Sequence, residues 1–378
     1  MIIRDLENTL QTSKKSILLL GHRQTGKSTL INNLKPDLKF NLANEGVYLD
    51  FARNPRELEE RLLHLKTKTI FIDEIQRLPT LLNTVQSLID DNPHYKFYLT
   101  GSSARKLKRG HANLLPGRIH TYYLGPLVQS ETDLDIKQVL ATGSLPGIWT
   151  EKNLQERTKT LKSYSATYLK EEIQAEALTK NIEGFSRFLF ILAATSGKYT
   201  DLTKLSSEAQ IPRQTAVRFM EILEDTLVAR RCEAFSKSQR KRLIQIPRMF
   251  FFDTGVLNGL LNNFSVSSDR IGHLFEHFIF NQLTDMAHSQ DKDIRISGYR
   301  TEHGAEVDFI IETQKEVIAL EVKASHQVHS SDLSGMKSFS DYFGKKCKKI
   351  VVYMGYAPKM IDKVEILPWK YFLENIKF

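Results

Sequence analysis

Residues 17–29 read Ile17-Leu18-Leu19-Leu20-Gly21-His22-Arg23-Gln24-Thr25-Gly26-Lys27-Ser28-Thr29. The four apolar residues predict a short buried strand, and the next stretch, which contains Leu30 and Ile31, predicts a helix. Between them, the eight residues from Gly21 to Ser28 fit the P-loop pattern, a glycine and four variable residues followed by Gly-Lys-Ser. A strand before this motif and a helix after it are the setting that phosphate binding requires, so the sequence predicts a nucleotide-binding site.

The chemistry of this motif predicts ATP and Mg²⁺ as its ligands. Glycines allow backbone N–H groups to surround phosphate oxygens, Lys27 supplies a positive charge to the β and γ phosphates, and Ser28 offers its hydroxyl to Mg²⁺. The residues expected to contact the nucleotide are Gly21, His22, Arg23, Gln24, Thr25, Gly26, Lys27, Ser28, Thr29 and, from a later strand, Thr100.

Two acids end a second apolar segment, Thr69-Ile70-Phe71-Ile72-Asp73-Glu74. We expect Asp73 to hold Mg²⁺ together with Ser28, and Glu74 to orient and deprotonate the attacking water. An acidic pair after a strand is common by chance, but its position downstream of the P-loop favours a Walker B segment. A third segment, Phe97–Thr100, ends in small polar residues, and Thr100 or Ser102 is the candidate sensor of the γ-phosphate.

Alternation of short β-rich and helical stretches from 16 to 124 predicts an α/β fold with a mostly parallel sheet. The expected strands are Ile17–Leu20, Val47–Phe51, Thr69–Ile72, Phe97–Thr100 and Ile119–Leu124. With 378 residues, the chain is long enough for several domains. We predict a nucleotide-binding domain (1–125), a helical lid (126–183), a winged helix-turn-helix (184–248) and a separate C-terminal α/β domain (249–378).

The predicted winged helix carries groups suited to nucleic acid. Arg213, Gln214 and Thr215 open the expected recognition helix, and Arg218 shares a face with Gln214 and Thr215. The run from 236 to 242 holds four basic residues in an expected turn. A formal net charge of +9 is compatible with a polyanionic partner. The alternative is that the winged helix serves as a protein-contact module.

Four charged residues near the C-terminus form a second constellation. In neighbouring strands Asp308 is expected beside Glu321, while Glu321 and Lys323, two residues apart, share one face. Asp308 and Glu321 would bind Mg²⁺, and Lys323 would help activate a water that attacks a phosphodiester, with Glu276 from the preceding helix completing the cluster. Two alternatives remain open, a solvated charged rim and a site of the same fold without catalysis.

The cysteine content and the lengths of the apolar runs indicate the compartment in which we expect the protein. The two cysteines, Cys232 and Cys347, have neither disulfide-framework nor zinc-site spacing, so we expect a reducing, cytoplasmic compartment. The longest apolar runs are too short to span a bilayer, so we expect no membrane contact.

Taken together, these residues resemble prokaryotic AAA+ ATPases joined to a C-terminal domain with a PD-(D/E)xK nuclease-like fold. The motifs that carry the resemblance are Gly21 to Ser28, Phe71 to Glu74, Leu99 to Ser102, Gly117-Arg118, Phe251 to Gly255, Leu274 to Glu276, Glu306 to Phe309 and Glu321 to Lys323. The resemblance implies an oligomeric, ring-like ATPase that acts on nucleic acid. We expect double-stranded DNA as the partner and a homo-oligomer, for which a hexameric ring is one form. It also makes Arg118 the candidate arginine that reaches a neighbouring subunit's nucleotide, with Arg105 and Arg109 as competitors and Pro116 as a departure from the usual pattern.

Three functions follow from these expectations. The first is an ATPase whose nucleotide state controls DNA engagement, with an Mg²⁺-dependent nuclease or its relic at the C-terminus. The second is a nucleotide-switched DNA-binding or scaffold protein with a silent nuclease-like domain used for assembly. The third is a signalling ATPase of an immunity or toxin system.

Overall fold

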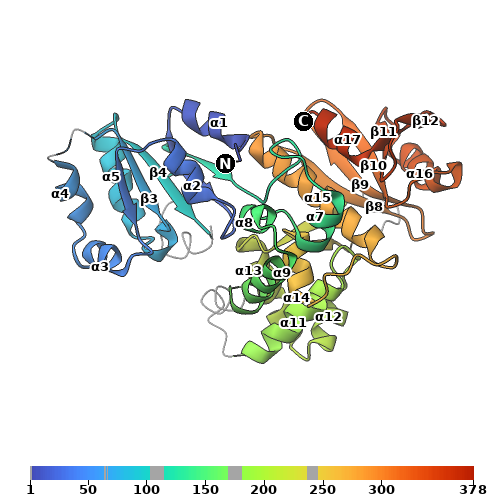
Figure 1. Ribbon diagram of the computed structural model, residues 1–378, viewed down its shortest axis with the longest axis horizontal. Coiled ribbons are helices and arrows are strands. Elements are labelled where there is room, and N and C mark those ends of the chain that lie inside the picture. Colours follow the sequence, from blue (N-terminus) through green and yellow to red (C-terminus); the bar gives the residue numbers. More distant parts are fainter. Residues whose placement is uncertain (1, 64, 66, 103–114, 169–180, 236–245) are drawn as a thin grey trace. The chain divides into compact units, whose positions relative to one another are not determined.

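The computed structural model describes residues 2–63, 65, 67–102, 115–168, 181–235 and 246–378 (Figure 1). The chain divides into two compact units. Unit 1 comprises Met1–Gly125 with the short segments Asp225–Leu227 and His288–Asp291, and unit 2 comprises the rest. In the described residues, no helix is both long and apolar enough to cross a membrane.

Unit 1 is built on a five-stranded sheet in the order β2-β3-β4-β1-β5, in which every neighbouring pair is parallel. This confirms the predicted α/β fold with a parallel sheet. The strands are β1 (Ser16–Leu20), β2 (Leu38–Asn41), β3 (Thr69–Asp73), β4 (Lys96–Gly101) and β5 (Ile119–Tyr123). The helical elements are α1 (Leu6–Thr12), α2 (Lys27–Asn33), α3 (Glu45–Arg53), α4 (Glu57–Leu63), η1 (Ile75–Arg77) and α5 (Leu81–Asp91).

Helices cover both faces of this sheet, which explains why β1 is apolar at every position. Ile17 and Leu19 pack in the cluster that contains side chains of α1 and α2. Leu18 and Leu20 pack in the cluster that contains side chains of α3, α4 and α5. The alternation of side chains along a strand therefore assigns these four residues to two separate cores.

One predicted strand, Val47–Phe51, is wrong, because these residues lie within α3. The side chain of Asn44 accepts a hydrogen bond from the Val47 backbone N–H at 3.2 Å and caps the helix, while Glu45 begins the first turn and Arg53 ends the last. The strand at this place is instead β2, which the sequence reasoning missed. Its four residues alternate only weakly, with Phe40 buried.

The strand order brings the candidate nucleotide residues to one edge. Strand β4 lies between β3 and β1, and the three strands are parallel. Their carboxyl ends therefore meet, so the P-loop after β1, Asp73 at the end of β3 and Thr100 near the end of β4 face the same region.

Unit 2 begins with helices and continues into a mixed sheet. Its first helical elements are α7 (Ile136–Thr142), α8 (Pro146–Thr150), α9 (Leu154–Ser163), η2 (Tyr164–Tyr168), α11 (Ile182–Ala194), α12 (Leu202–Glu208) and α13 (Arg213–Asp225). The later helical elements are α14 (Thr254–Leu260), α15 (Ile271–Ser289), η3 (Ser330–Leu333), α16 (Ser334–Phe343) and α17 (Trp369–Asn375). The strands are β6 (Ala229–Ala234), β7 (Arg248–Phe251), β8 (Arg295–Arg300), β9 (Glu306–Glu312), β10 (Val317–Lys323), β11 (Lys348–Tyr353), β12 (Lys359–Ile361) and β13 (Val364–Pro368).

Within the described residues of unit 2, eight strands form one sheet in the order β12-β13-β11-β10-β9-β8-β6-β7. Strand β6 pairs antiparallel with β7 and parallel with β8, so the strands that follow α11, α12 and α13 continue directly into the C-terminal sheet. The predicted division between residues 248 and 249 falls inside β7. The statement that the four predicted segments are independent domains stays a prediction.

Two loops of unit 2 are fastened together by the carboxylate of Asp253. It accepts hydrogen bonds from the backbone N–H groups of Ser144 at 2.8 Å and Val256 at 3.0 Å, which caps α14. Burial raises the pKa of Asp253 to about 6 despite these donors. A Cβ atom on Gly255 would lie 2.2 Å from the Thr142 carbonyl oxygen, so only glycine permits this approach.

Candidate functional sites

The backbone of the P-loop needs its two glycines. Gly26 has φ of +90°, a left-handed conformation that side chains disfavour. A Cβ atom on Gly21 would lie 2.2 Å from the carbonyl oxygen of Leu124, so the loop approaches the end of β5 too closely for any other residue. Within the loop, the Thr25 hydroxyl donates to the His22 carbonyl at 2.9 Å. The loop is therefore held in shape by the protein itself.

Two cations are buried at this loop. The Lys27 ammonium group donates to the carbonyl oxygens of Gly21 at 2.8 Å and His22 at 2.7 Å. The Arg4 guanidinium donates to the carbonyl oxygens of Thr25 at 2.7 Å and Gly125 at 2.9 Å. Sequence reasoning missed Arg4, because it lies before the first strand and belongs to no motif. Both cations raise the positive potential around the place where phosphate oxygens would lie.

A hydroxyl and a carboxylate meet where Mg²⁺ was predicted. The Ser28 hydroxyl donates to Asp73 Oδ1 at 2.9 Å, and the Thr100 hydroxyl donates to the same oxygen. Thr100 Oγ1 also accepts from the Glu74 backbone N–H at 3.3 Å. Oxygen donors of this kind suit Mg²⁺, so the residues present fit the predicted ion. Thr100, one of the two candidate sensors, is thus hydrogen-bonded to both Asp73 and the backbone of Glu74.

A glutamine not singled out from the sequence holds the candidate base. The Gln76 amide donates through Nε2 to Glu74 Oε2 and, at 3.1 Å, to the Ser102 hydroxyl. Gln76 is only 6% exposed, and a Cβ atom on Gly101 would lie 2.9 Å from its side-chain oxygen. Glycine at this place therefore leaves room for the amide. Its position two residues after the acidic pair was the only available signal.

The other predicted contact residues divide by exposure. His22 and Thr25 are buried in the loop, whereas Arg23, Gln24 and Thr29 are exposed. Arg118 is half-buried and makes a two-pronged ion pair with Asp90, through Nε at 2.6 Å and Nη2 at 2.9 Å. Arg105 and Arg109 lie outside the described residues. The role of Arg118 toward a neighbouring subunit stays a prediction.

The four residues of the second constellation lie together in unit 2. Leu320 of β10 lies opposite Phe309 of β9, which puts Glu321 beside Asp308. The Lys323 ammonium group donates to Glu321 Oε1 at 2.9 Å, and the Val322 backbone N–H donates to Asp308 Oδ2 at 2.8 Å. Glu276 reaches the cluster from α15, close enough to interact electrostatically with Asp308.

Burial sets the proton affinities of these acids. It raises the pKa of Asp308 to about 7, with the Glu276 carboxylate adding to the effect, and the pKa of Glu321 to about 8, with Asp308 adding to it. Burial likewise raises the pKa of Glu276, while Arg248 opposes the shift. Sequence reasoning missed Arg248, whose guanidinium donates to Glu276 Oε1 and to the Asp308 carbonyl oxygen.

The side chains predicted to contact nucleic acid lie on α13. Arg213, Gln214 and Arg218 are exposed, and Thr215 is half-buried. The face opposite carries Ala216, Phe219 and other buried residues, as an amphipathic helix requires. The basic turn at 236–242 lies outside the described residues.

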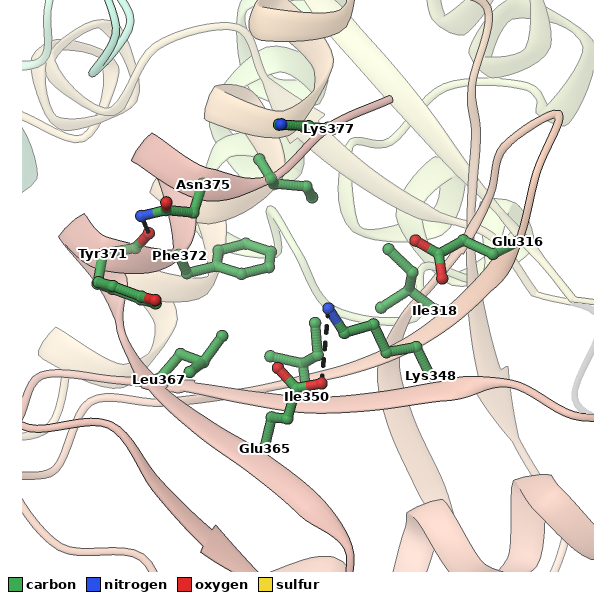
Figure 2. Close-up of a pocket in the computed structure, with 11 residues that line it drawn as sticks. Glu316, Ile318, Lys348, Ile350, Glu365, Leu367, Tyr371, Phe372, Asn375 and Lys377 are labelled. Carbon is green, nitrogen blue, oxygen red and sulfur yellow. Dashed lines mark hydrogen bonds and ion pairs between the residues drawn. The ribbon is translucent and has the colours of Figure 1, made fainter.

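A separate pocket of about 300 Å³ lies beside β11 and α17 (Figure 2). Lys348, part of a basic run from 345 to 349, points into it and pairs with Glu365 at 3.5 Å. This contact pairs the lysine with a carboxylate of its own sheet.

Comparisons with known proteins agree with the geometry of unit 1. A family model described as an AAA domain matches residues 13–133. Models described as domains of unknown function, DUF8612 and DUF4143, match residues 133–267 and 271–372. The parallel five-stranded sheet and the P-loop of unit 1 are typical of the domain that this family model describes. A winged helix and a nuclease-like domain are not established by these matches.

Relatives and solved structures add little about activity. The uncharacterized proteins Mb2031c of Mycobacterium bovis and Rv2008c of Mycobacterium tuberculosis are each 25% identical over 319 residues, covering 81% of this chain and 70% of the relative. The Pif1 helicase from Candida albicans is 14% identical with a TM-score of 0.26, and the match covers 44% of this chain and 48% of the helicase. The replication initiator DnaA bound to AMPPCP and single-stranded DNA is 10% identical with a TM-score of 0.26, covering 58% of this chain and 86% of DnaA. Scores this low do not establish a shared overall fold.

Proposed function

We propose that the protein is an ATPase that binds ATP with Mg²⁺ at the P-loop and hydrolyses the γ-phosphate. The observation that carries the proposal is the 2.9 Å hydrogen bond between Ser28 and Asp73, beside the buried ammonium group of Lys27. Hydroxyl, carboxylate and ammonium are the three side-chain groups that a P-loop enzyme brings to its triphosphate.

Each residue has a separate task in this proposal. Ser28 and Asp73 would hold Mg²⁺, which neutralises charge on phosphate oxygens. Lys27, whose ammonium group now donates to two loop carbonyls, is the cation available to the phosphates. Glu74 accepts a proton from the attacking water, and Gln76 positions its carboxylate through the Nε2 hydrogen bond.

The Glu74→Gln variant tests this assignment. It keeps the size of the side chain but removes the base, so we expect ATP binding with turnover reduced by about 10²- to 10⁴-fold. Lys27→Ala should instead weaken ATP binding itself. Calorimetry with ATP and a phosphate-release assay separate the two effects. Unchanged turnover in Glu74→Gln would remove Glu74 from the role of base.

We propose further that ATP binding controls the engagement of nucleic acid, with double-stranded DNA as the expected partner. Support comes from the net charge of +9 and from the exposed Arg213, Gln214 and Arg218 on one helix. Gel shifts with blunt, overhanging and circular duplexes and with RNA, each with and without a slowly hydrolysed ATP analogue, test both statements. Equal binding with and without nucleotide would contradict the coupling.

The proposal includes assembly into a homo-oligomeric ring in the cytoplasm. A ring would let Arg118 of one subunit serve the nucleotide of the next, after exchanging its contact with Asp90. The mass of the assembly in solution, measured by light scattering with and without ATP, tests this part. A monomer under both conditions would contradict it.

For the C-terminal domain we propose a role without cleavage, in gripping nucleic acid or joining subunits. We call Glu276, Asp308 and Glu321 the carboxylate cluster. The buried Arg248 contacts two of its members, Glu276 and Asp308, and this favours a role without cleavage over metal-dependent cleavage. Incubation of wild type and Asp308→Ala with labelled linear and branched DNA and Mg²⁺ or Mn²⁺ is the test. Cleavage by wild type that Asp308→Ala lacks would establish a nuclease instead.

A further inference from the structure

The carboxylate cluster of unit 2 already contains a cation supplied by the chain. Arg248, the first residue of β7, is 2% exposed, and its two terminal nitrogens donate to Glu276 Oε1 and to the Asp308 carbonyl oxygen. An arginine is rarely buried to this extent without paired charges, because removing a guanidinium from water is costly. The pairing with Glu276 therefore accounts for its burial.

The surroundings fit the planar guanidinium. Its central carbon lies 4.8 Å from the centre of the Phe309 ring, 5.4 Å from that of Phe250 and 5.5 Å from that of Tyr199. Aromatic rings at these distances attract a cation. Gly298 of β8 leaves the remaining room, since a Cβ atom there would lie 3.3 Å from Arg248 Nη2. Strands β7, β8 and β9 and the segment that contains Tyr199 thus surround this side chain.

Each of the three acids has a donor from within the protein. Glu276 accepts from Arg248, Asp308 accepts from the Val322 backbone at 2.8 Å, and Glu321 accepts from Lys323 at 2.9 Å. In the part of the chain that the structure describes, no three His, Cys, Asp or Glu side chains are grouped so that they could hold a metal ion. The residues present therefore do not fit the divalent cation expected from the nuclease-like resemblance.

We propose that Arg248 is the resident cation of this cluster, that it keeps divalent metal out, and that it fastens β7 to α15 and β9. The cluster then acts as a structural joint between helix α15 and the eight-stranded sheet. This inference rests on the non-cleaving role proposed for the C-terminal domain and is independent of ATP hydrolysis at the P-loop.

Thermal unfolding of the full chain with and without Mn²⁺ tests the inference. Wild type is compared with Arg248→Met, with the double variant Arg248→Met/Glu276→Gln, and with Arg295→Met as a matched change at an exposed position of the same sheet. An Asp73→Asn chain measures any contribution of Mn²⁺ bound at the P-loop. ATPase activity is recorded in parallel, so that failure of the P-loop proposal is recognised separately.

We expect Mn²⁺ to leave wild type unchanged apart from the P-loop contribution. Arg248→Met should melt lower by on the order of 10 °C, because Glu276 loses its buried partner, and should regain part of the loss with Mn²⁺. The double variant should recover without Mn²⁺ and no longer respond to it. Arg295→Met should melt like wild type, because its partner Glu312 lies 3.9 Å away and the arginine is largely exposed.

Three results would overturn the inference. One is Mn²⁺ stabilisation of wild type that an Asp308→Asn variant abolishes. Another is an Arg248→Met chain as stable as wild type. The third is an Arg248→Met chain that folds but takes up no Mn²⁺. If Arg248→Met fails to fold, calorimetric titration of Mn²⁺ into wild type and into Asp308→Asn tests the inference instead. Equal Mn²⁺ binding by the two proteins supports the inference. Weaker Mn²⁺ binding by Asp308→Asn refutes it.

Discussion

Replacement of Gln76 by leucine should slow ATP turnover without weakening ATP binding. The side chain is buried, and its amide connects the Glu74 carboxylate to the Ser102 hydroxyl at the ends of β3 and β4. Leucine has a similar volume but no polar atoms, so the change removes the two hydrogen bonds and leaves the packing nearly intact. Glu74 would then be free to turn away from the attacking water.

The size of the effect follows from the charge on the acceptor. A hydrogen bond to an ionised group contributes about 1.5 to 3 kcal/mol, roughly twice a neutral one. If this energy holds Glu74 in the reactive orientation, its loss lowers kcat by about 10- to 150-fold. Binding energy for ATP comes from the loop and Lys27, so KM should change by less than about threefold.

Steady-state phosphate release over a range of ATP concentrations separates kcat from KM. Gln86→Leu, the same chemical change at a half-buried position of α5, is the matched control and should behave like wild type. In a Glu74→Gln background, Gln76→Leu should have no further effect, because the group that it positions is already absent. A Gln76→Leu chain with wild-type or higher kcat, or additive losses in the double variant, would refute the reasoning.

Three further outcomes are expected. Lys27→Ala and Arg118→Ala should each lack ATPase activity, and an equimolar mixture should regain part of it if Arg118 acts on a neighbouring subunit, whereas no recovery would contradict this role. Arg218→Ala should weaken DNA binding and reduce the slope of log K against log salt concentration by about 1, and an unchanged slope would exclude a phosphate contact. His277 has its pKa lowered to about 3 by burial, so as pH falls below 6.5 the unfolded chain binds a proton that the folded chain does not. His277→Gln should therefore remove a loss of stability of about 2 kcal/mol between pH 7 and pH 5, measured by urea unfolding, and parallel profiles for the two proteins would contradict this.

Local sequence patterns were sufficient to predict strand β1 of unit 1 and the strand and helix on either side of the P-loop. A fully buried strand such as β1 must be apolar throughout, and the P-loop letters require a strand before them and a helix after them, so both were predicted correctly. The same reasoning failed at Val47–Phe51, where β-forming residues lie in a helix whose beginning is determined by the Asn44 cap. The Asn44 cap and the packing of Phe51 in the core both favour the helix, against the strand preference of the apolar residues in this segment.

Two of the residues that sequence reasoning missed, Arg4 and Arg248, make contacts that join positions far apart in the chain. Arg4 reaches Gly125 across 121 residues, and Arg248 reaches Asp308 across 60. No local pattern encodes such a contact, yet Arg248 leaves one trace, a lone cation at the start of the apolar run Met249 to Phe252. A charge at the head of a buried strand requires an opposite charge elsewhere, because an unpaired one is too costly. That partner is Glu276, the acid predicted to complete the cluster, so the balance of charge, more than the spacing of the motif, supports the structural role proposed for these residues.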